Sequence, residues 1–289
     1  MGTILQLLIS GIAMGFIYAL VAIEYTLIWN STGLLNFSHD KIITVGAYIF
    51  AATFIIKFNM NKPLAIVLTF MLMGILGSVI ASGIFNPLRH MRSNIFAVMG
   101  TMMLGRILAE AIRLIYGPVP FTIENWLSGT IKIGTLMVTK ANVIICVVAI
   151  LVVAALQLFM NFTKIGKAMR CVAQNKKAAA LMGINVAQNI CVTTAVSSII
   201  LNSVIGMLII PLFNISTTMA ASIGLKGFSA GVIGGFGYLP GAILGGLFIG
   251  VVENLAVVVL PAVYKDIVSF VLLIIFLLVH PSGFLGKKA

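Results

Sequence analysis

Long apolar runs separated by short polar connections make up almost all of this chain, and they restrict the folds open to it. A membrane-spanning helix needs about 20 apolar residues, and such runs recur from residue 3 to residue 280. Only 8% of the residues are charged, against about 25% in a soluble domain. The sequence therefore predicts an all-α polytopic membrane protein with a single transmembrane domain over residues 1–289.

Eight runs have the length of a span, and two polar stretches interrupt the pattern. We expect the spans at about 3–29, 42–58, 63–85, 94–115, 141–160, 188–212, a glycine-rich run ending at residue 254, and 265–280. Residues 30–41 and 215–236 contain small and polar types. Irregular backbone at membrane depth is tolerated only where protein buries it or where it lines a cavity. We therefore expect eight or nine transmembrane helices with one or two broken or re-entrant segments.

The formal net charge of +12 has a topological meaning, because most of the cations fall between apolar runs. Three connections are the most basic: Arg89 with Arg92, residues 161–187, and Lys287 with Lys288. Cytoplasmic loops carry an excess of Lys and Arg, so residues 161–187 and the C-terminus are expected in the cytoplasm. All three share one side only if residues 215–236 cross the membrane, which gives nine crossings and an outer N-terminus.

A few charged residues fall inside or beside the predicted spans. Glu24 lies near the end of the first run and is expected to face protein, water or the membrane interface, because a carboxylate in lipid is costly. Arg106 and Glu110 are four residues apart and can pair on one helix face, and Arg113 lies three beyond Glu110. We interpret this group as a self-neutralising structural pair rather than as part of a transport path.

Several function classes lack their sequence signature. The chain has no G-x-x-x-x-G-K-[ST] phosphate loop, no H-E-x-x-H, no G-x-S-x-G and no paired Cys/His ligand set. We therefore predict no enzyme activity, no metal site and no cofactor bound by this chain. Nucleic-acid binding would need a basic face on a soluble domain, so it is not expected either.

Two local patterns give candidate functional residues. Lys177-Ala178-Ala179 followed by Gly183 has the spacing of the loop that permeases of ATP-binding-cassette (ABC) importers present to their ATPases, although an ordinary basic loop remains the alternative. For such a loop we expect a short amphipathic helix that Gly183 ends as its C-cap. The coupling candidates are Lys164, Gly166, Arg170, Lys177, Ala178, Ala179 and Gly183. Glycines at every fourth position indicate a helix face for close packing: Gly237, Gly241 and Gly245, and Gly246 and Gly250.

Three stretches together carry a family resemblance. Residues 18–26, Asn36-Phe37-Ser38-His39 with Gly46-Ala47-Tyr48, and residues 234–253 closely resemble the branched-chain amino acid ABC transporter permease family, in its shorter, H-type subunit. The chain differs from the family pattern at three places. Glu24 replaces a usual Gly, Asp40-Lys41 replaces a common Gly-Glu, and Gln174-Asn175 replaces acidic residues.

The resemblance implies a permease subunit of an importer for branched-chain or related amino acids in the cell (inner or plasma) membrane. Its implied partners are a second homologous permease, two ATPases that use ATP and magnesium, and an extracytoplasmic amino-acid-binding protein. For the translocation pathway we expect polar residues from the two interrupted stretches to bind the substrate transiently. They are Asn36, Ser38, His39, Ser216, Thr217 and Thr218.

Two alternatives stay open from the sequence. One is a sugar-type ABC permease of the same superfamily, which would pair with itself. The other is an ATP-independent secondary transporter or channel, which normally carries a coupling carboxylate at mid-span. Glu24, Glu110 and Glu253 are all expected near span ends, which disfavours that class.

Overall fold

The computed structural model describes residues 2–88, 94–123, 126–127, 129–133, 136–280 and 282–285. Over these ranges, eight helices are long and apolar enough to cross a membrane, which confirms the all-α polytopic prediction. They are Ile4–Thr32, His39–Lys57, Lys62–Leu88, Ile95–Tyr116, Lys140–Phe162, Val186–Ile209, Leu239–Ala256 and Ala262–Val279. The basic turn around Arg89 and Arg92, Glu124, and the tail with Lys287 and Lys288 lie outside the described residues.

Four of these spans are continuous α-helices, and four are built from shorter pieces. The continuous ones are α1 (Gly2–Thr32), α5 (Asn94–Tyr116), α6 (Lys140–Phe162) and α12 (Leu239–Ala256). In three others a π-helical segment joins α-helical pieces: α2 (His39–Tyr48) with η1 (Ile49–Lys57); α3 (Lys62–Ile80) with η2 (Ala81–Phe85) and α4 (Asn86–Leu88); and α9 (Val186–Ser197) with η3 (Ser198–Asn202) and α10 (Ser203–Ile209). The last span joins a 3₁₀ turn, η4 (Ala262–Tyr264), to α13 (Lys265–Val279).

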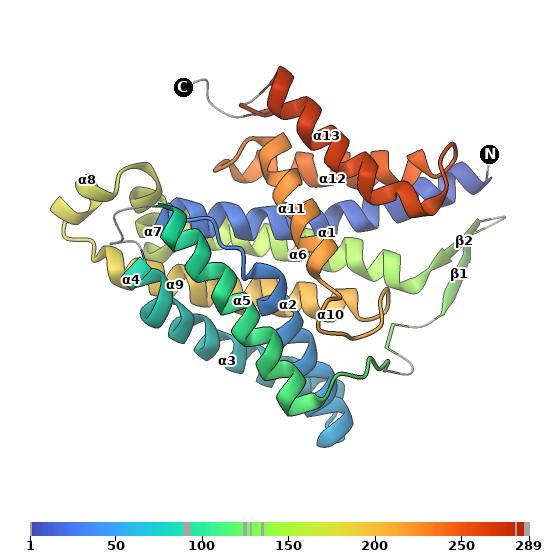
Figure 1. The fold of residues 1–289 in the computed structure, drawn as a ribbon, viewed down its shortest axis with the longest axis horizontal. Coiled ribbons are helices and arrows are strands. Elements are labelled where there is room, and N and C mark those ends of the chain that lie inside the picture. The colour runs from blue at the N-terminus through green and yellow to red at the C-terminus, as the bar shows by residue number, and fades with distance from the viewer. Residues whose placement is uncertain are drawn as a thin grey trace.

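The helices run back and forth between two ends of the molecule, with α1 through the middle (Figure 1). At one end, Asn30 at the end of α1 donates to the carbonyl of Gly237 (3.0 Å), and the Leu285 amide donates to the Gly234 carbonyl (3.2 Å). Helices α7 (Lys164–Gln174) and α8 (Lys176–Leu181) lie at this same end. At the opposite end, Gln6 donates to the carbonyl of Met137 (3.4 Å).

A broken crossing lies between α10 and α12. Residues 210–220 form turns and one isolated bridge from Ile215 to Phe121, and α11 (Ala221–Gly234) follows. Fourteen helical residues rise about 21 Å, which is less than the roughly 30 Å of a hydrocarbon core. The interruption predicted at residues 215–236 is therefore present. Its first part, up to residue 220, consists of turns with one isolated bridge, and its second part is the short helix α11.

A small hairpin lies beside the N-terminal end of α1 (Figure 1). Strand β1 (Thr130–Ile133) pairs antiparallel with β2 (Leu136–Thr139), with Thr130 opposite Thr139. Alternating apolar residues around 131–133 give the period-2 pattern of a strand. The hairpin leads directly into α6, whose first backbone amide donates to the Gly129 carbonyl (2.9 Å).

Glycines set how closely the central helices approach. A Cβ added at Gly250 of α12 would collide with the backbone of Gly15 in α1, and one at Gly246 would collide with Ala19. On the α11 side, a Cβ at Gly241 or Gly245 would meet backbone carbonyls. Gly237 is not on this helix face, because it lies in the turn before α12 with φ +92°.

Replacing Gly250 by Ala is expected to destabilise the protein by about 1–3 kcal/mol, because the added methyl group collides with rigid backbone rather than with a movable side chain. Gly83→Ala is the matched control, since no atom lies within 4 Å of a Cβ built there. The midpoint of thermal unfolding in detergent checks this. Equal midpoints for the two variants would show that the glycine contact does not hold α1 against α12.

Candidate functional site

The two interrupted stretches meet inside the protein. After α1 ends at Thr32, residues 33–38 are non-helical, and Asn36 Oδ1 accepts hydrogen bonds from the backbone amide (3.0 Å) and hydroxyl (2.6 Å) of Ser38. This local pairing starts α2 at His39. Lys41 then donates from Nζ to the carbonyl of Thr217 (3.2 Å). A direct hydrogen bond therefore joins the first break to the second.

The six pathway candidates occupy different environments at this junction. Asn36, Ser38 and His39 are all buried. Ser216 and Thr217 are half-buried and Thr218 is exposed, with the Ser216 and Thr218 hydroxyls 3.5 Å apart. The first three side chains therefore hold the break in shape, and the second three lie closer to open space. A pathway role for these residues stays a prediction.

Glu24 lies deeper than the sequence indicated. Helix α1 continues to Thr32, so the carboxylate is eight residues inside the helix and only 1% exposed. It contacts His39 Nδ1 directly and accepts a hydrogen bond from Asn202 (3.2 Å). The ring of Tyr25 packs on His39 with centroids 4.7 Å apart. The expectation that Glu24 sits near a span end is therefore wrong, and its partners are protein groups of α2 and η3.

A second buried charged group joins four helices. Lys226 of α11 lies 2.8 Å from Glu253 Oε1 of α12 and 2.7 Å from Asp266 Oδ1 of α13. Tyr18 of α1 donates to Glu253 (3.2 Å), as does Ser269 of α13 (3.0 Å). This cluster was not predicted, although one pattern in the sequence points to it. Lys226 is the only charged residue between Lys177 and Glu253, so its counter-ion had to come from a neighbouring helix.

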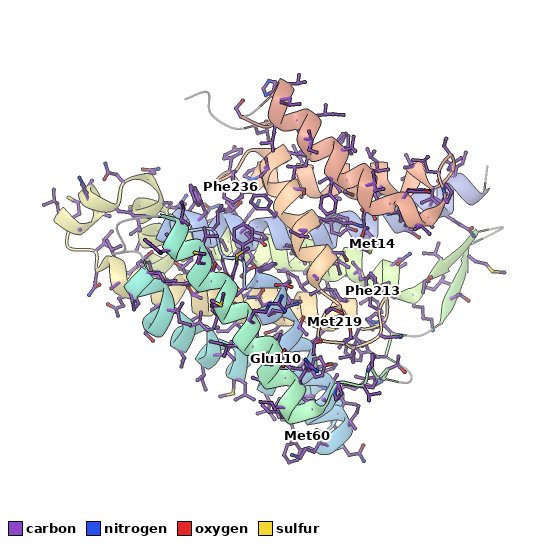
Figure 2. All side chains as sticks on the ribbon, in the orientation of Figure 1. Met14, Met60, Glu110, Phe213, Met219 and Phe236 are labelled. Atoms are coloured by element: carbon purple, nitrogen blue, oxygen red, sulfur yellow. The ribbon has the colours of Figure 1, made fainter. Side chains whose placement is uncertain are left out.

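Helix α5 carries charges on an exposed face. Glu110 pairs with Arg113 (3.3 Å) and not with Arg106, so the predicted Arg106–Glu110 pair is wrong. Figure 2 shows Glu110 on α5. Among the residues that the structure describes, Arg106 has no carboxylate partner. An unpaired guanidinium facing lipid is costly, so this face of α5 is suited to protein or water.

A pocket of about 510 Å³ opens where α5, α11 and the first break adjoin. Figure 1 shows α2 between α5 and α11, and α2 contacts both. Asp40, Lys41 and Arg106 supply its charged lining. Asp40 and Lys41 form an ion pair (2.9 Å) and are each about one-fifth exposed. The pocket is therefore lined by the residues that follow the buried Ser38 and His39.

The basic segment 161–187 forms two short helices that project from one end of the protein (Figure 1). Its cations Lys164, Arg170 and Lys177 are exposed, whereas Gly166 and Ala179 are buried and Ala178 is exposed. A Cβ at Gly166 would collide with the backbone of α6. The segment therefore packs on the bundle through small and apolar residues, including Met169 and Val172, and its charged side chains point outward.

Side-chain caps fix the ends of these helices. Thr163 accepts from the Gly166 amide (2.9 Å), and Asn175 accepts from the Ala178 amide (3.0 Å). Asn and Asp cap helix N-termini about equally well, so the uncharged Asn175 keeps a function that an acidic residue would have. Helix α8 ends at Leu181, and Gly183 follows with φ +84°, where the Ile184 amide donates to the Ala179 carbonyl (3.1 Å). This is the glycine C-cap that the sequence predicted.

The end of α8 also presents apolar side chains to solvent. Leu181 is 89% exposed and Met182 is 83% exposed, directly before Gly183. Large apolar residues exposed together on a polar segment commonly mark a protein contact. The coupling candidates and this apolar pair therefore lie on one projecting surface.

Comparison with known proteins decides the family. Residues 7–277 match the family model described as the branched-chain amino acid transport system / permease component. The chain belongs to this permease family. The match covers all eight candidate spans except the first residues of α1 and the last residues of α13, so both interrupted stretches and the basic segment fall within it.

Individual relatives support the same family. The chain is 32% identical over 296 residues to the high-affinity branched-chain amino acid transport system permease protein BraD of Pseudomonas aeruginosa, covering 98% of this chain and 96% of that protein. It is 30% identical over 298 residues, with the same coverage, to LivH of Salmonella typhimurium, which has the corresponding description. A solved structure, PsaBC from Streptococcus pneumoniae in complex with Fab, matches with a TM-score of 0.50 and 13% identity over 98% of this chain and 93% of that one, a likeness of fold alone.

Replacing Lys226 by Met is expected to destabilise this permease by about 3–5 kcal/mol, because it leaves Glu253 buried without its counter-ion. Lys57→Met is the control, since Lys57 is exposed at the end of η1. Unfolding of both variants in detergent, followed by far-UV circular dichroism, gives the comparison. A Lys226→Met protein as stable as the control would mean that the cluster is not needed for stability.

Proposed function

We propose that this chain is a transmembrane permease subunit of an ABC importer for branched-chain or related amino acids. The observation that carries the proposal is the family match over residues 7–277, together with relatives described as branched-chain amino acid permeases. ATP hydrolysis, with its magnesium, belongs to separate ATPase subunits on this proposal. A soluble binding protein delivers the substrate from outside the cell.

The end that carries α7 and α8 is proposed to face the cytoplasm. Its exposed cations agree with the positive-inside rule, and its exposed apolar pair, Leu181 and Met182, suits docking into a groove of an ATPase. The C-terminal residues 282–285 contact the turn before α12 at this same end. Nine alternating crossings, with α11 and residues 210–220 counted as one, then put the N-terminus outside.

The translocation path is proposed to follow the junction of the two breaks. Lys41 links this junction to Thr217, and α5 bounds it with its exposed charged face. A second, homologous permease would cover that face, since only about one-quarter of the span Ile95–Tyr116 is buried in this chain. Movement of the projecting helices α7 and α8 would reach the junction through α9 and α1, which α7 contacts.

The reconstituted complex of this chain with its partner permease, ATPases and binding protein is expected to accumulate labelled leucine in liposomes only when ATP is present. The same preparation should not accumulate labelled ribose, which tests the sugar-permease alternative. Equal leucine uptake with and without ATP would contradict the proposed mechanism and favour a secondary transporter or channel.

Replacing Gly183 by Val is expected to lower leucine uptake at least about tenfold while ATP hydrolysis continues. A β-branched residue is strained at φ +84°, so the end of α8 would shift and displace Leu181 and Met182. Gly183→Asn is the matched control, because Asn adopts the left-handed conformation at little cost. If both variants transport like the original protein, the coupling contact lies elsewhere.

A further inference from the structure

The pocket between α5, α11 and the first break has both charged and apolar walls, and membership of the permease family does not say which ligand such walls bind. Its volume of about 510 Å³ is within the range of small-molecule sites. Its walls divide into a charged part, made by Asp40, Lys41 and Arg106, and an apolar part. The apolar part consists of side chains from α1, the first break, α5 and α11: Tyr25, Phe37, Met102, Met103, Ala221 and Leu225.

The charged part contains both signs and has one cation in excess. Lys41 is already engaged, with Asp40 Oδ2 at 2.9 Å and the Thr217 carbonyl at 3.2 Å. Arg106 has no carboxylate partner in the described part of the chain. A guanidinium presents paired donors that match a carboxylate. The pocket is therefore complementary to a ligand that brings a carboxylate to Arg106.

Asp40, which lines the same pocket as Arg106, has one carboxylate oxygen that can still accept a hydrogen bond. The ion pair with Lys41 occupies Oδ2 of Asp40, and no hydrogen bond to Oδ1 is present among the described residues. Asp40 can thus accept from an ammonium group on the same ligand. A neutral polyol would form no ion pair with the exposed Arg106, so it would lack the charge-assisted contact that a carboxylate makes.

The apolar walls of the pocket favour a ligand that also has an aliphatic side chain. Phe and Met side chains bind aliphatic groups by contact alone, and Met adapts to differences in shape. A small ligand with ammonium and carboxylate groups on one carbon and an aliphatic side chain on the same carbon matches all three features.

We propose that this pocket is the binding site within the permease for a zwitterionic aliphatic amino acid, with Arg106 holding the carboxylate and Asp40 the ammonium group. This inference rests on the proposed function and assigns it to residues. It differs from the sequence-based expectation, in which Asn36, Ser38 and His39 met the substrate. Those three are buried and do not line the pocket, and they directly precede Asp40 and Lys41 at the start of α2.

The test measures binding of labelled L-leucine to the complex of this chain with its partner permease and ATPases, in lipid nanodiscs without the binding protein. Two competitors separate the charged groups. L-leucinamide lacks the carboxylate, and 4-methylpentanoate lacks the amine. The original complex is expected to bind leucine at least about tenfold more tightly than either competitor, since a charge-assisted hydrogen bond contributes about this much.

Single substitutions then test which residue binds the carboxylate of leucine and which binds its ammonium group. Arg106→Met should weaken leucine binding at least about tenfold and leave leucinamide unchanged, and Arg106→Lys should restore part of the loss. Asp40→Asn should remove the preference for leucine over 4-methylpentanoate. Arg113→Met is the control on the same helix, outside the pocket and half-exposed, and it should keep both preferences.

Two outcomes would overturn the site: an original complex that binds no leucine, or an Arg106→Met complex that still prefers leucine over leucinamide as before. ATP-driven uptake by the full system distinguishes this from the proposed function. If the variants show normal uptake and still prefer leucine over both competitors, the proposed site is wrong and the proposed importer function stands. If leucine binds, the substitutions weaken this binding, and ATP drives no uptake, the proposed site stands and the proposed importer function is wrong.

Discussion

The close approach of α1 to α12 is the contact on which the rest of the structure depends. In a bilayer, helices gain little from burying apolar surface, because lipid is as apolar as the protein, so backbone proximity at small residues supplies the packing. Gly11 and Gly15 of α1 face Gly246 and Gly250 of α12. This fixes the position of Tyr18, three residues beyond Gly15, where its hydroxyl reaches Glu253. The glycine contact therefore also builds the buried charged cluster.

The charged side chains in the spans fall into two kinds: buried ones that bond neighbouring helices together, and exposed ones that do not. Glu24 joins α1 to α2 and η3, and Glu253 joins α12 to α1, α11 and α13. Arg106 differs, because its side chain is exposed on α5 and lies beside an ion pair that is itself only partly buried. The first two groups stabilise the bundle, whereas the third is available to a ligand or partner.

The sequence predicted the spans well because length and hydropathy are sufficient for that purpose. It also located both breaks, since small polar residues cannot sit in lipid, and the C-cap of α8, since Gly adopts that left-handed backbone conformation without steric cost. It failed where tertiary contacts decide. Glu24 was placed near a span end because the polar Asn30 to Thr32 still belong to the helix. Pairing of Arg106 with Glu110 followed from spacing alone, whereas the structure turns Arg106 toward the pocket.

The Asp40–Lys41 pair gives the proposed site a property that a transporter needs. A transport site must bind its substrate well enough to admit it and weakly enough to release it. An ammonium group that approaches Asp40 competes with Lys41, which lies 2.9 Å away and also bonds to Thr217. Part of the binding free energy is therefore offset by weakening this internal pair. Release restores the full attraction between Asp40 and Lys41, while Lys41 keeps its hydrogen bond to Thr217, so an empty site returns to a defined geometry without an additional partner.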